Sequence, residues 1–349
     1  MNDLITVITP YYNTPQYIFD EYLQALVNQT YQNFKAIVVD DGSKEEYGAY
    51  LESLKAKLPD NVTVIRKENG GASSARNHAL SLLFQEPDAG GYITFVDSDD
   101  LIDPCYLENL HRALDNGKYA LSFCERGDFA DSASREGIFT NEACGYEAVS
   151  VLDVIRRGSF GYCTGWLFPL ELVSDLRFDE NIKLCEDQKF SFECIGRAKS
   201  DCGRVSGRAL YYYRKHGGNA TAFMKSADYL SAIAVSDEIL ESPFVRDNDD
   251  IYRGRINHKA YWMIRYMLAL CREKPARYRR EIKSRIAQFK REIKPYLEKG
   301  NKFVSVNSRL MFSKTLFLFF LKIESKMIQK IYKKRMKESK KCIKKTENI

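Results

Sequence analysis

The sequence lacks the features of an integral membrane protein or a protein held together by disulfides. It has no run of about 18 apolar residues, the length needed to span a bilayer, and its longest apolar run is Leu316 to Leu321. The N-terminus has no basic segment and no long apolar stretch, so no signal peptide is expected. None of the nine cysteines stands in a C-x-x-C pair, which predicts reduced, mostly buried thiols in a cytosolic protein.

Two common nucleotide-binding motifs are also missing. The chain contains no G-x-G-x-x-G and no G-x-x-x-x-G-K-[ST], which argues against a dinucleotide-binding domain and a P-loop NTPase. Of the four histidines, His78, His111 and His258 have no evident partner in the sequence.

Charge is distributed unevenly along the 349 residues. Residues 1–271 carry 28 Lys/Arg and 40 Asp/Glu, whereas residues 272–349 carry 25 and 7. An acidic body with a basic end indicates a membrane surface or a nucleic acid as partner. The content of 44% hydrophobic residues is enough for a sizeable core, and the length suggests two to three domains or one large domain with an extension.

Strand-like and helix-like segments alternate in the first half. Short β-rich runs are expected at 5–9, 34–39, 62–65, 92–96 and 120–124. Apolar residues recur at helical spacing between them, and Thr14-Pro15 is typical of an N-cap followed by proline at the first helical position. This alternation predicts an α/β fold with a mainly parallel sheet. A further strand is expected within 205–214, and 226–298 is expected to be largely helical.

Carboxylates follow two of the predicted strands. Ligands of such sheets bind outside the carboxyl ends of the strands, where Asp40-Asp41-Gly42-Ser43 and Asp97-Ser98-Asp99 stand. Two carboxylates one residue apart suit a hard divalent cation that also binds a diphosphate. Either segment alone is equally typical of a turn whose Asp caps the next helix.

Three further segments carry candidate groups. Residues 69–77 run from a glycine pair into a helix of small residues, where Arg76 would reach a phosphate; the alternative is a loop before a helix packed through alanines. Glu186-Asp187 offers a general base or an acidic helix start. His216 offers a metal ligand or an ordinary surface residue.

The order of these segments resembles the family 2 glycosyltransferases. The resemblance covers residues 5–221 and rests on eight segments: TVITPYYN (6–13), ALVNQTYQNF (25–34), AIVVDDGS (36–43), ENGGASSARNHAL (68–80), YITFVDSDD (92–100), GWLFP (165–169), FDENIKLCEDQKF (178–190) and YYYRKHGGNAT (211–221). It implies a GT-A (Rossmann-like) nucleotide-sugar-binding fold with a mainly parallel mixed sheet and a C-terminal α-helical extension.

The resemblance also implies roles for individual residues. Asp187 would be the catalytic base, and Asp99 and His216 would hold a divalent cation, Mn²⁺ or Mg²⁺. Asp41 would bind a uracil-type base and Asp97 the ribose. The full implied nucleotide-sugar site is Pro10, Tyr12, Asp41, Arg76, Asp97 and Ser98.

The implied reaction is inverting transfer of a single sugar from a nucleotide sugar, most simply a UDP-sugar, to a hydroxyl of a glycan or lipid-linked acceptor. The chain lacks the Q-x-x-R-W motif and multiple spans of processive members. It therefore resembles the distributive enzymes of capsule, exopolysaccharide and lipopolysaccharide assembly. Two alternatives are a non-catalytic nucleotide-sugar-binding subunit and a membrane-surface scaffold.

The basic end predicts attachment to a membrane. In 312–331, apolar residues recur at helical spacing beside a row of lysines, as in a helix lying at the inner face of a cell membrane. Packing on the protein body or on a second copy is the alternative, so a homodimer stays open. No nucleic-acid recognition motif accompanies the lysines, and nucleic acid is not expected as a partner. The expected domains are a glycosyltransferase domain (1–225), a helical extension (226–300) and a basic amphipathic segment (301–349).

Overall fold

The computed structural model describes residues 3–86, 91–130, 139, 143–215, 224–273 and 277–296. The chain divides into two compact units. The first contains the described residues up to 215 except Ile182–Leu184, and the second contains Ile182–Leu184 with the helices after residue 224. His216 and the segment 301–349 lie outside the described residues.

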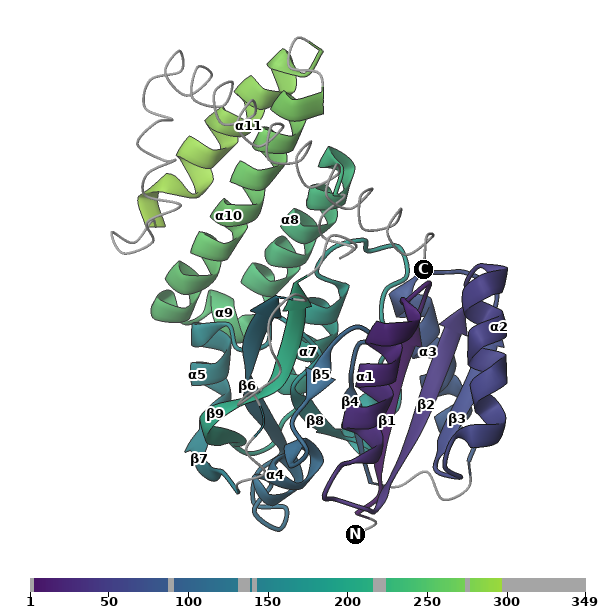
Figure 1. The fold of residues 1–349 in the computed structure, drawn as a ribbon. Coiled ribbons are helices and arrows are strands. Elements are labelled where there is room, and N and C mark those ends of the chain that lie inside the picture. The colour runs from purple at the N-terminus through teal and green to yellow at the C-terminus, as the bar shows by residue number, and fades with distance from the viewer. Residues whose placement is uncertain are drawn as a thin grey trace. The chain divides into compact units, whose positions relative to one another are not determined.

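A mixed sheet of nine strands forms the first unit (Figure 1). Its strands are β1 (Ile5–Tyr11), β2 (Phe34–Asp41), β3 (Val62–Lys67), β4 (Tyr92–Phe95), β5 (Leu101–Ile102), β6 (Leu121–Ala130), β7 (Gly145–Val149), β8 (Trp166–Pro169) and β9 (Cys202–Lys215). The order is β3-β2-β1-β4-β8-β6-β9-β5, and β7 pairs with β9. Strands β3, β2, β1 and β4 are mutually parallel, whereas β8 is antiparallel to both β4 and β6.

Strands β1, β2 and β4 are buried along almost their whole length, which explains their apolar runs, whereas β3 lies at the edge of the sheet and is largely unburied. In β2, Ala36 and Val38 belong to a core cluster with side chains of α1, whereas Ile37 and Val39 are buried outside that cluster. Alternation along a strand places these two pairs on opposite faces of the sheet.

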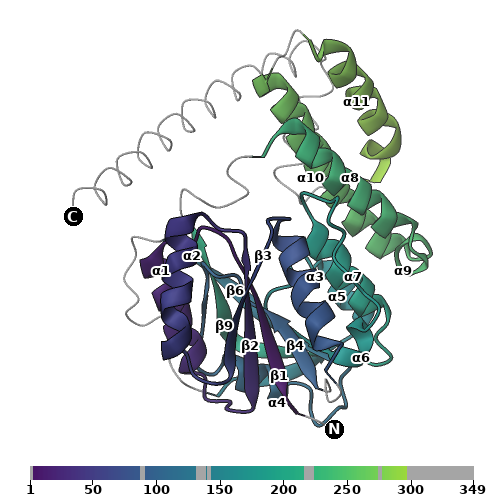
Figure 2. The same ribbon diagram turned by 90° about the vertical axis from the view of Figure 1, so that its right-hand side faces the viewer.

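Helices cover both faces of the sheet (Figure 2). Helices α1 (Gln16–Val27) and α2 (Glu45–Leu54) lie on one side, and α3 (Ala72–Leu83), α5 (Val151–Arg157), α6 (Leu170–Val173) and α7 (Glu186–Gly196) on the other. Helix α4 (Tyr106–Arg112) contributes Tyr106, Leu107 and Leu110 to the core cluster shared with α1.

The start of the first helix differs from its prediction by one residue. Pro15 occupies the N-cap and α1 begins at Gln16, without a side-chain cap. Thr14, expected to cap this helix, instead places its hydroxyl 2.8 Å from the hydroxyl of Ser98. A long-range contact therefore takes the oxygen that local sequence assigned to the helix.

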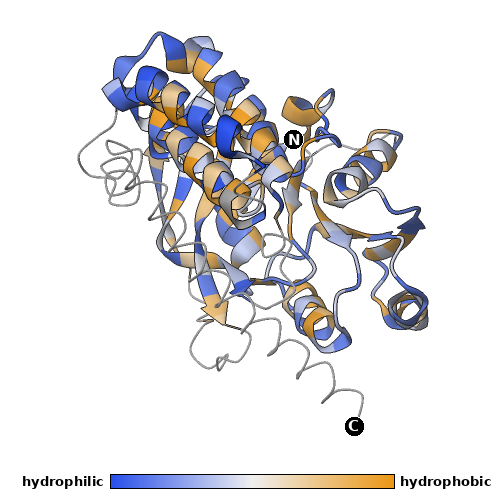
Figure 3. Ribbon diagram, turned by 90° about the horizontal axis from the view of Figure 1, so that it is seen from above, coloured by the Kyte–Doolittle hydropathy of each residue, from blue (hydrophilic) through white to orange (hydrophobic). Residues whose placement is uncertain are grey.

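The second unit is helical, as expected for 226–298. It contains α8 (Ser226–Glu241), α9 (Pro243–Arg246), α10 (Asp249–Glu273) and α11 (Arg279–Glu292). Apolar and polar residues alternate along its helices (Figure 3), and α11 buries Ile282, Ile286 and Phe289, spaced as one helical face. Across the described ranges, no helix has the length and apolar character needed to cross a membrane.

Candidate active site

The carboxyl ends of three neighbouring parallel strands form the centre of the site. β1 ends at Tyr11 and β2 at Asp41, and Asp97 comes two residues after the end of β4. Because β1 lies between the other two strands, the segments that follow them meet at one edge of the sheet.

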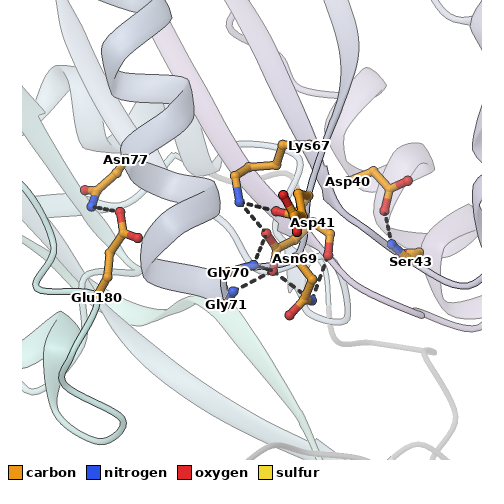
Figure 4. A network of polar contacts seen from close by, with 10 residues as sticks. Asp40, Asp41, Ser43, Lys67, Asn69, Gly70, Gly71, Asn77 and Glu180 are labelled. Atoms are coloured by element: carbon orange, nitrogen blue, oxygen red, sulfur yellow. Dashed lines mark hydrogen bonds and ion pairs between the residues drawn. The ribbon is translucent and has the colours of Figure 1, made fainter.

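Asp41 organises the loop that precedes α3 (Figure 4). Its buried carboxylate accepts hydrogen bonds from Lys67 Nζ at 2.9 Å, Gly70 N at 3.0 Å and Gly71 N at 2.6 Å. Asn69 Nδ2 adds bonds to the carboxylate at 3.1 Å and to the backbone carbonyl at 2.8 Å. Asp41 therefore shapes the loop, because four donors converge on its carboxylate.

The loop after β1 is tied to the turn after β2. Asn13 has a φ of 49°, and its N–H donates to Ser43 Oγ at 3.0 Å while its Oδ1 accepts from Lys44 N at 2.9 Å. Pro10 is partly buried in β1, and Tyr12 is 53% exposed beside this junction. An exposed aromatic ring at this place is available to a ligand.

The turn after β4 alternates between accessible and buried side chains. Asp97 and Asp99 are partly exposed, whereas Ser98 and Asp100 are buried. Ser98 pairs with Thr14, so its hydroxyl links the turn to the β1 loop. The two carboxylates singled out by the motif are thus the ones that remain accessible to a ligand.

Strand β9 supports this turn from behind. Tyr211 Oη donates to Asp100 Oδ2 at 2.6 Å and accepts from Asp97 N at 3.2 Å. Arg214, fully buried, donates from N to Asp100 Oδ1 at 2.8 Å and from Nε to the Asp99 carbonyl at 2.7 Å. Burial, followed by the charges of Asp99 and Asp97, raises the pKa of Asp100 well above its ordinary value.

The support from Tyr211 and Arg214 was missed by sequence reasoning. Both lie in the segment YYYRK, which the sequence marked as a strand and as part of the family resemblance but without a role for either residue. They are more than 110 residues from their partners, and the local pattern carries no signal for such a pairing.

Arg76 connects the strand-end carboxylates to α7. Its Nη2 donates to Asp97 Oδ1 at 2.8 Å, and its Nη1 lies 3.5 Å from Glu186 Oε1. The side chain is only 5% exposed, and its guanidinium carbon lies 5.3 Å from the Phe178 ring centroid. Among the described residues, its Nε and Nη1 make no hydrogen bond. The guanidinium thus links the turn after β4 to α7, and its planar N–H edge is of the kind that pairs with oxyanions.

The next residue in α3 holds the segment that leads to α7. Asn77 Nδ2 donates to the Phe178 carbonyl and Asn77 Oδ1 accepts from Phe178 N, both at 2.8 Å. Asn77 also donates to Glu180 at 2.9 Å (Figure 4). Phe178 stacks on Phe190 of α7 with ring centroids 4.1 Å apart. This packing fixes α7 relative to Arg76.

Asp187 lies in the first turn of α7. The helix follows Cys185, whose φ is 72°, and Asp187 Oδ1 accepts from Gln188 N at 2.7 Å. Burial, followed by the charge of Glu186, raises the pKa of Asp187 from 3.8 to about 8, and Arg76 opposes this shift. A carboxylate with a pKa near the working pH is suited to proton transfer.

The carboxylates after β4 are of the ligand type that a divalent cation prefers. Asp97 and Asp99 offer accessible hard oxygen donors one residue apart, and Arg76 engages only one oxygen of Asp97. Within the described part of the chain, no group of three or more His, Cys, Asp or Glu is placed to hold a metal.

Most of the predicted site residues come together in the first unit. Arg76 contacts Asp97 directly, the charges of Asp97 and Arg76 act on Asp187, and Ser98 joins the β1 loop. His216 lies outside the described residues.

Comparison with known proteins identifies the class. Residues 6–146 match the model of glycosyl transferase family 2. An uncharacterized glycosyltransferase of Haemophilus influenzae is 31% identical over 203 residues, which cover 56% of this chain and 73% of that protein. The minor teichoic acid biosynthesis protein GgaB of Bacillus subtilis is 30% identical over 222 residues, and glycosyltransferase GlyA of Streptococcus pneumoniae is 32% identical over 200 residues.

The chain therefore belongs to the family 2 glycosyltransferases. It covers only 23% of GgaB and 27% of GlyA, about a quarter of the length of these relatives. A crystal structure of S. aureus TarS 1-349 in complex with UDP-GlcNAc shares the fold with a TM-score of 0.63 at 19% identity, over 93% of this chain and 91% of that one. The predicted GT-A fold with C-terminal helices is confirmed.

Proposed function

We propose that this protein transfers a single sugar from a nucleotide sugar to a hydroxyl of a glycan or lipid-linked acceptor in bacterial polysaccharide synthesis. The observation that carries the proposal is the position of Arg76 between Asp97 at the strand ends and Glu186 beside Asp187. This arrangement brings the carboxylates of the turn after β4 and of α7 together, which supports a site that binds a donor and an acceptor side by side. The UDP-GlcNAc complex of TarS supports a UDP-sugar as the donor.

In the proposed reaction, Asp187 removes the proton of the acceptor hydroxyl as that oxygen attacks the anomeric carbon, which inverts the configuration. Pro10, Tyr12, Asp41, Asp97 and Ser98 line or shape the nucleotide site. Arg76, whose Nε and Nη1 make no hydrogen bond to a described residue, would pair with the diphosphate. A divalent cation, Mn²⁺ or Mg²⁺, when bound by Asp99 and His216, supplies positive charge for the leaving diphosphate.

The basic end extends the proposal to localisation. The apolar and lysine rows of 312–331 support attachment of 301–349 to the inner face of the cell membrane, where a lipid-linked acceptor would be reached. Deleting 301–349 should abolish binding to vesicles containing anionic lipid and leave turnover of a soluble acceptor intact. Unchanged vesicle binding would contradict this part of the proposal.

A screen of nucleotide sugars tests the transfer reaction. Purified protein with Mn²⁺ should release nucleoside diphosphate from one donor among UDP-, GDP- and dTDP-sugars. Asp187→Asn should lower this release by about 10²–10⁴ and retain UDP binding. Asp175→Asn is the matched control, because Asp175 is an exposed carboxylate that pairs with Arg197 away from the site. Tight nucleotide-sugar binding without release on any acceptor would instead indicate a non-catalytic binding subunit.

A further inference from the structure

In the first unit, the guanidinium of Arg126 is stacked on two tyrosine rings. It lies in β6, immediately after the register shifts between β6 and β9. Such bulges turn a side chain away from the regular alternation and are frequent beside active sites. The guanidinium carbon lies 3.6 Å from the Tyr162 ring centroid and 4.7 Å from that of Tyr213. Aromatic rings hold a guanidinium by its face and leave its N–H edge for a ligand.

The N–H groups of Arg126 make no hydrogen bond to the residues that the structure describes. Among these residues, its ion-pair contact is with Asp128 at 3.9 Å. Asp128 is itself 2.7 Å from Lys215 Nζ. The side chain of Arg126 is 25% exposed, and Tyr162 is 46% exposed. A ligand can therefore reach both the cation and one of the rings that hold it.

This cluster adjoins the proposed base. Ser191, one helical turn after Asp187, donates its hydroxyl to the Tyr162 carbonyl at 3.2 Å. The neighbouring Cys163 is buried where the charges of Arg76 and Asp187 act on it. Cys163 thus lies near Asp187, and its chain neighbour Tyr162 carries the exposed ring that contacts Arg126.

Arg126 is also linked to the turn after β4. It stands opposite Tyr211 in the register of β6 and β9, and Tyr211 accepts the amide hydrogen of Asp97. Tyr211 therefore connects Arg126 to the turn after β4, as Tyr162 connects it to α7.

The site is surrounded by acidic side chains, so a cation there would favour binding of an anionic ligand. Asp97, Asp99, Glu186 and Asp187 are all acidic, and Arg76 is already engaged with two of them. The body of the protein, residues 1–271, carries 12 more acidic than basic residues. A negatively charged acceptor would be repelled here unless a cation received its charge.

We propose that Arg126, held by Tyr162 and Tyr213, forms an acceptor subsite for an oxyanion next to the hydroxyl that receives the sugar. The oxyanion is a phosphodiester or a carboxylate, both of which pair with the N–H edge of a guanidinium. This inference rests on the proposed function and names its acceptor class as an anionic glycan or polyol phosphate.

Acceptor kinetics separate the two sources of the oxyanion. The probes are a glycerol phosphate oligomer, an oligosaccharide containing glucuronate and a neutral oligosaccharide of the same length. Arg126→Ala should raise KM about tenfold or more for the preferred anionic probe and much less for the neutral one. Arg126→Lys should recover only part of the loss, because an ammonium cannot form the bidentate pair. Arg156→Ala, which removes an exposed arginine paired with Asp153, is the matched control.

A binding measurement distinguishes failure of this inference from failure of the proposed function. Calorimetry follows each anionic probe binding to Asp187→Asn protein saturated with UDP, with and without Arg126→Ala. Loss of probe affinity at retained UDP affinity supports the subsite even if no transfer occurs. Unchanged probe affinity, or an equal loss for the neutral probe and for UDP, would overturn it.

Discussion

Asp187 should impose a pH dependence on sugar transfer, because the proposed base is active only when it has lost its proton. With a pKa of about 8, its ionised fraction at pH 7 is about one in ten. The value of kcat/KM should therefore rise about tenfold per pH unit below pH 8 and level off above it. This quantity reports on ionisations of the free enzyme.

Two neighbouring charges should shift the rising, low-pH part of this kcat/KM profile (the acid limb) in opposite directions. Glu186 raises the pKa of Asp187 and Arg76 lowers it. Glu186→Gln should therefore shift the limb to lower pH, and Arg76→Gln should shift it to higher pH while also reducing the plateau. Each unit of displacement corresponds to about 1.4 kcal/mol between the two protonation states.

The assay is nucleoside diphosphate release at subsaturating acceptor between about pH 6 and pH 9. Asp175→Asn provides the control, since it removes a carboxylate at the surface and should leave the limb in place. The reasoning is refuted if Asp187→Asn keeps the same limb, or if Glu186→Gln moves it to higher pH.

Three further predictions concern the turn after β4 and the loop before α3. Asp99→Ala should lower nucleoside diphosphate release by about a hundredfold or more and raise the Mn²⁺ concentration needed for half-maximal rate; equal Mn²⁺ titrations would remove Asp99 from the metal site. Gly71→Ala should lower the free energy of unfolding by about 1–3 kcal/mol in urea titrations, because Gly71 has a φ of +92° although its surroundings are open; a neutral result would mean that the loop adapts. Ser98→Ala should lower the same free energy by about 1–3 kcal/mol, because the buried Thr14 hydroxyl loses its partner; Ser53→Ala, at an exposed hydroxyl, should not.

Local signals in the sequence were sufficient for the parallel strands β1 to β4 and for the placement of the carboxylates, whereas β5, β7 and β8 were not predicted. The buried run of β2 and its terminal Asp41 were both predicted, because a parallel strand buried on two faces needs a continuous apolar segment. The start of α1 was misplaced because Thr14 pairs with a residue 84 positions away. Local rules for helix caps contain no information on such a partner.

Roles within the site were less predictable than positions. The motif D-S-D singled out its two carboxylates, and folding leaves Asp97 and Asp99 accessible but buries Ser98, which the family resemblance assigned to the nucleotide-sugar site. The link from Arg76 to Glu186 joins two segments 110 positions apart in the chain. Only packing of α3 against the segment before α7 brings these charges together.

The hydrogen bonds between β9 and the turn after β4 are reciprocal, and this has a consequence for local stability. The Asp97 amide is protected by Tyr211, and the Arg214 amide is protected by Asp100. Opening either segment therefore exposes an amide of the other, so the two should exchange hydrogen with solvent as one cooperative unit. The turn after β4 thus derives its rigidity from the last residues of β9, which come more than a hundred positions later in the chain.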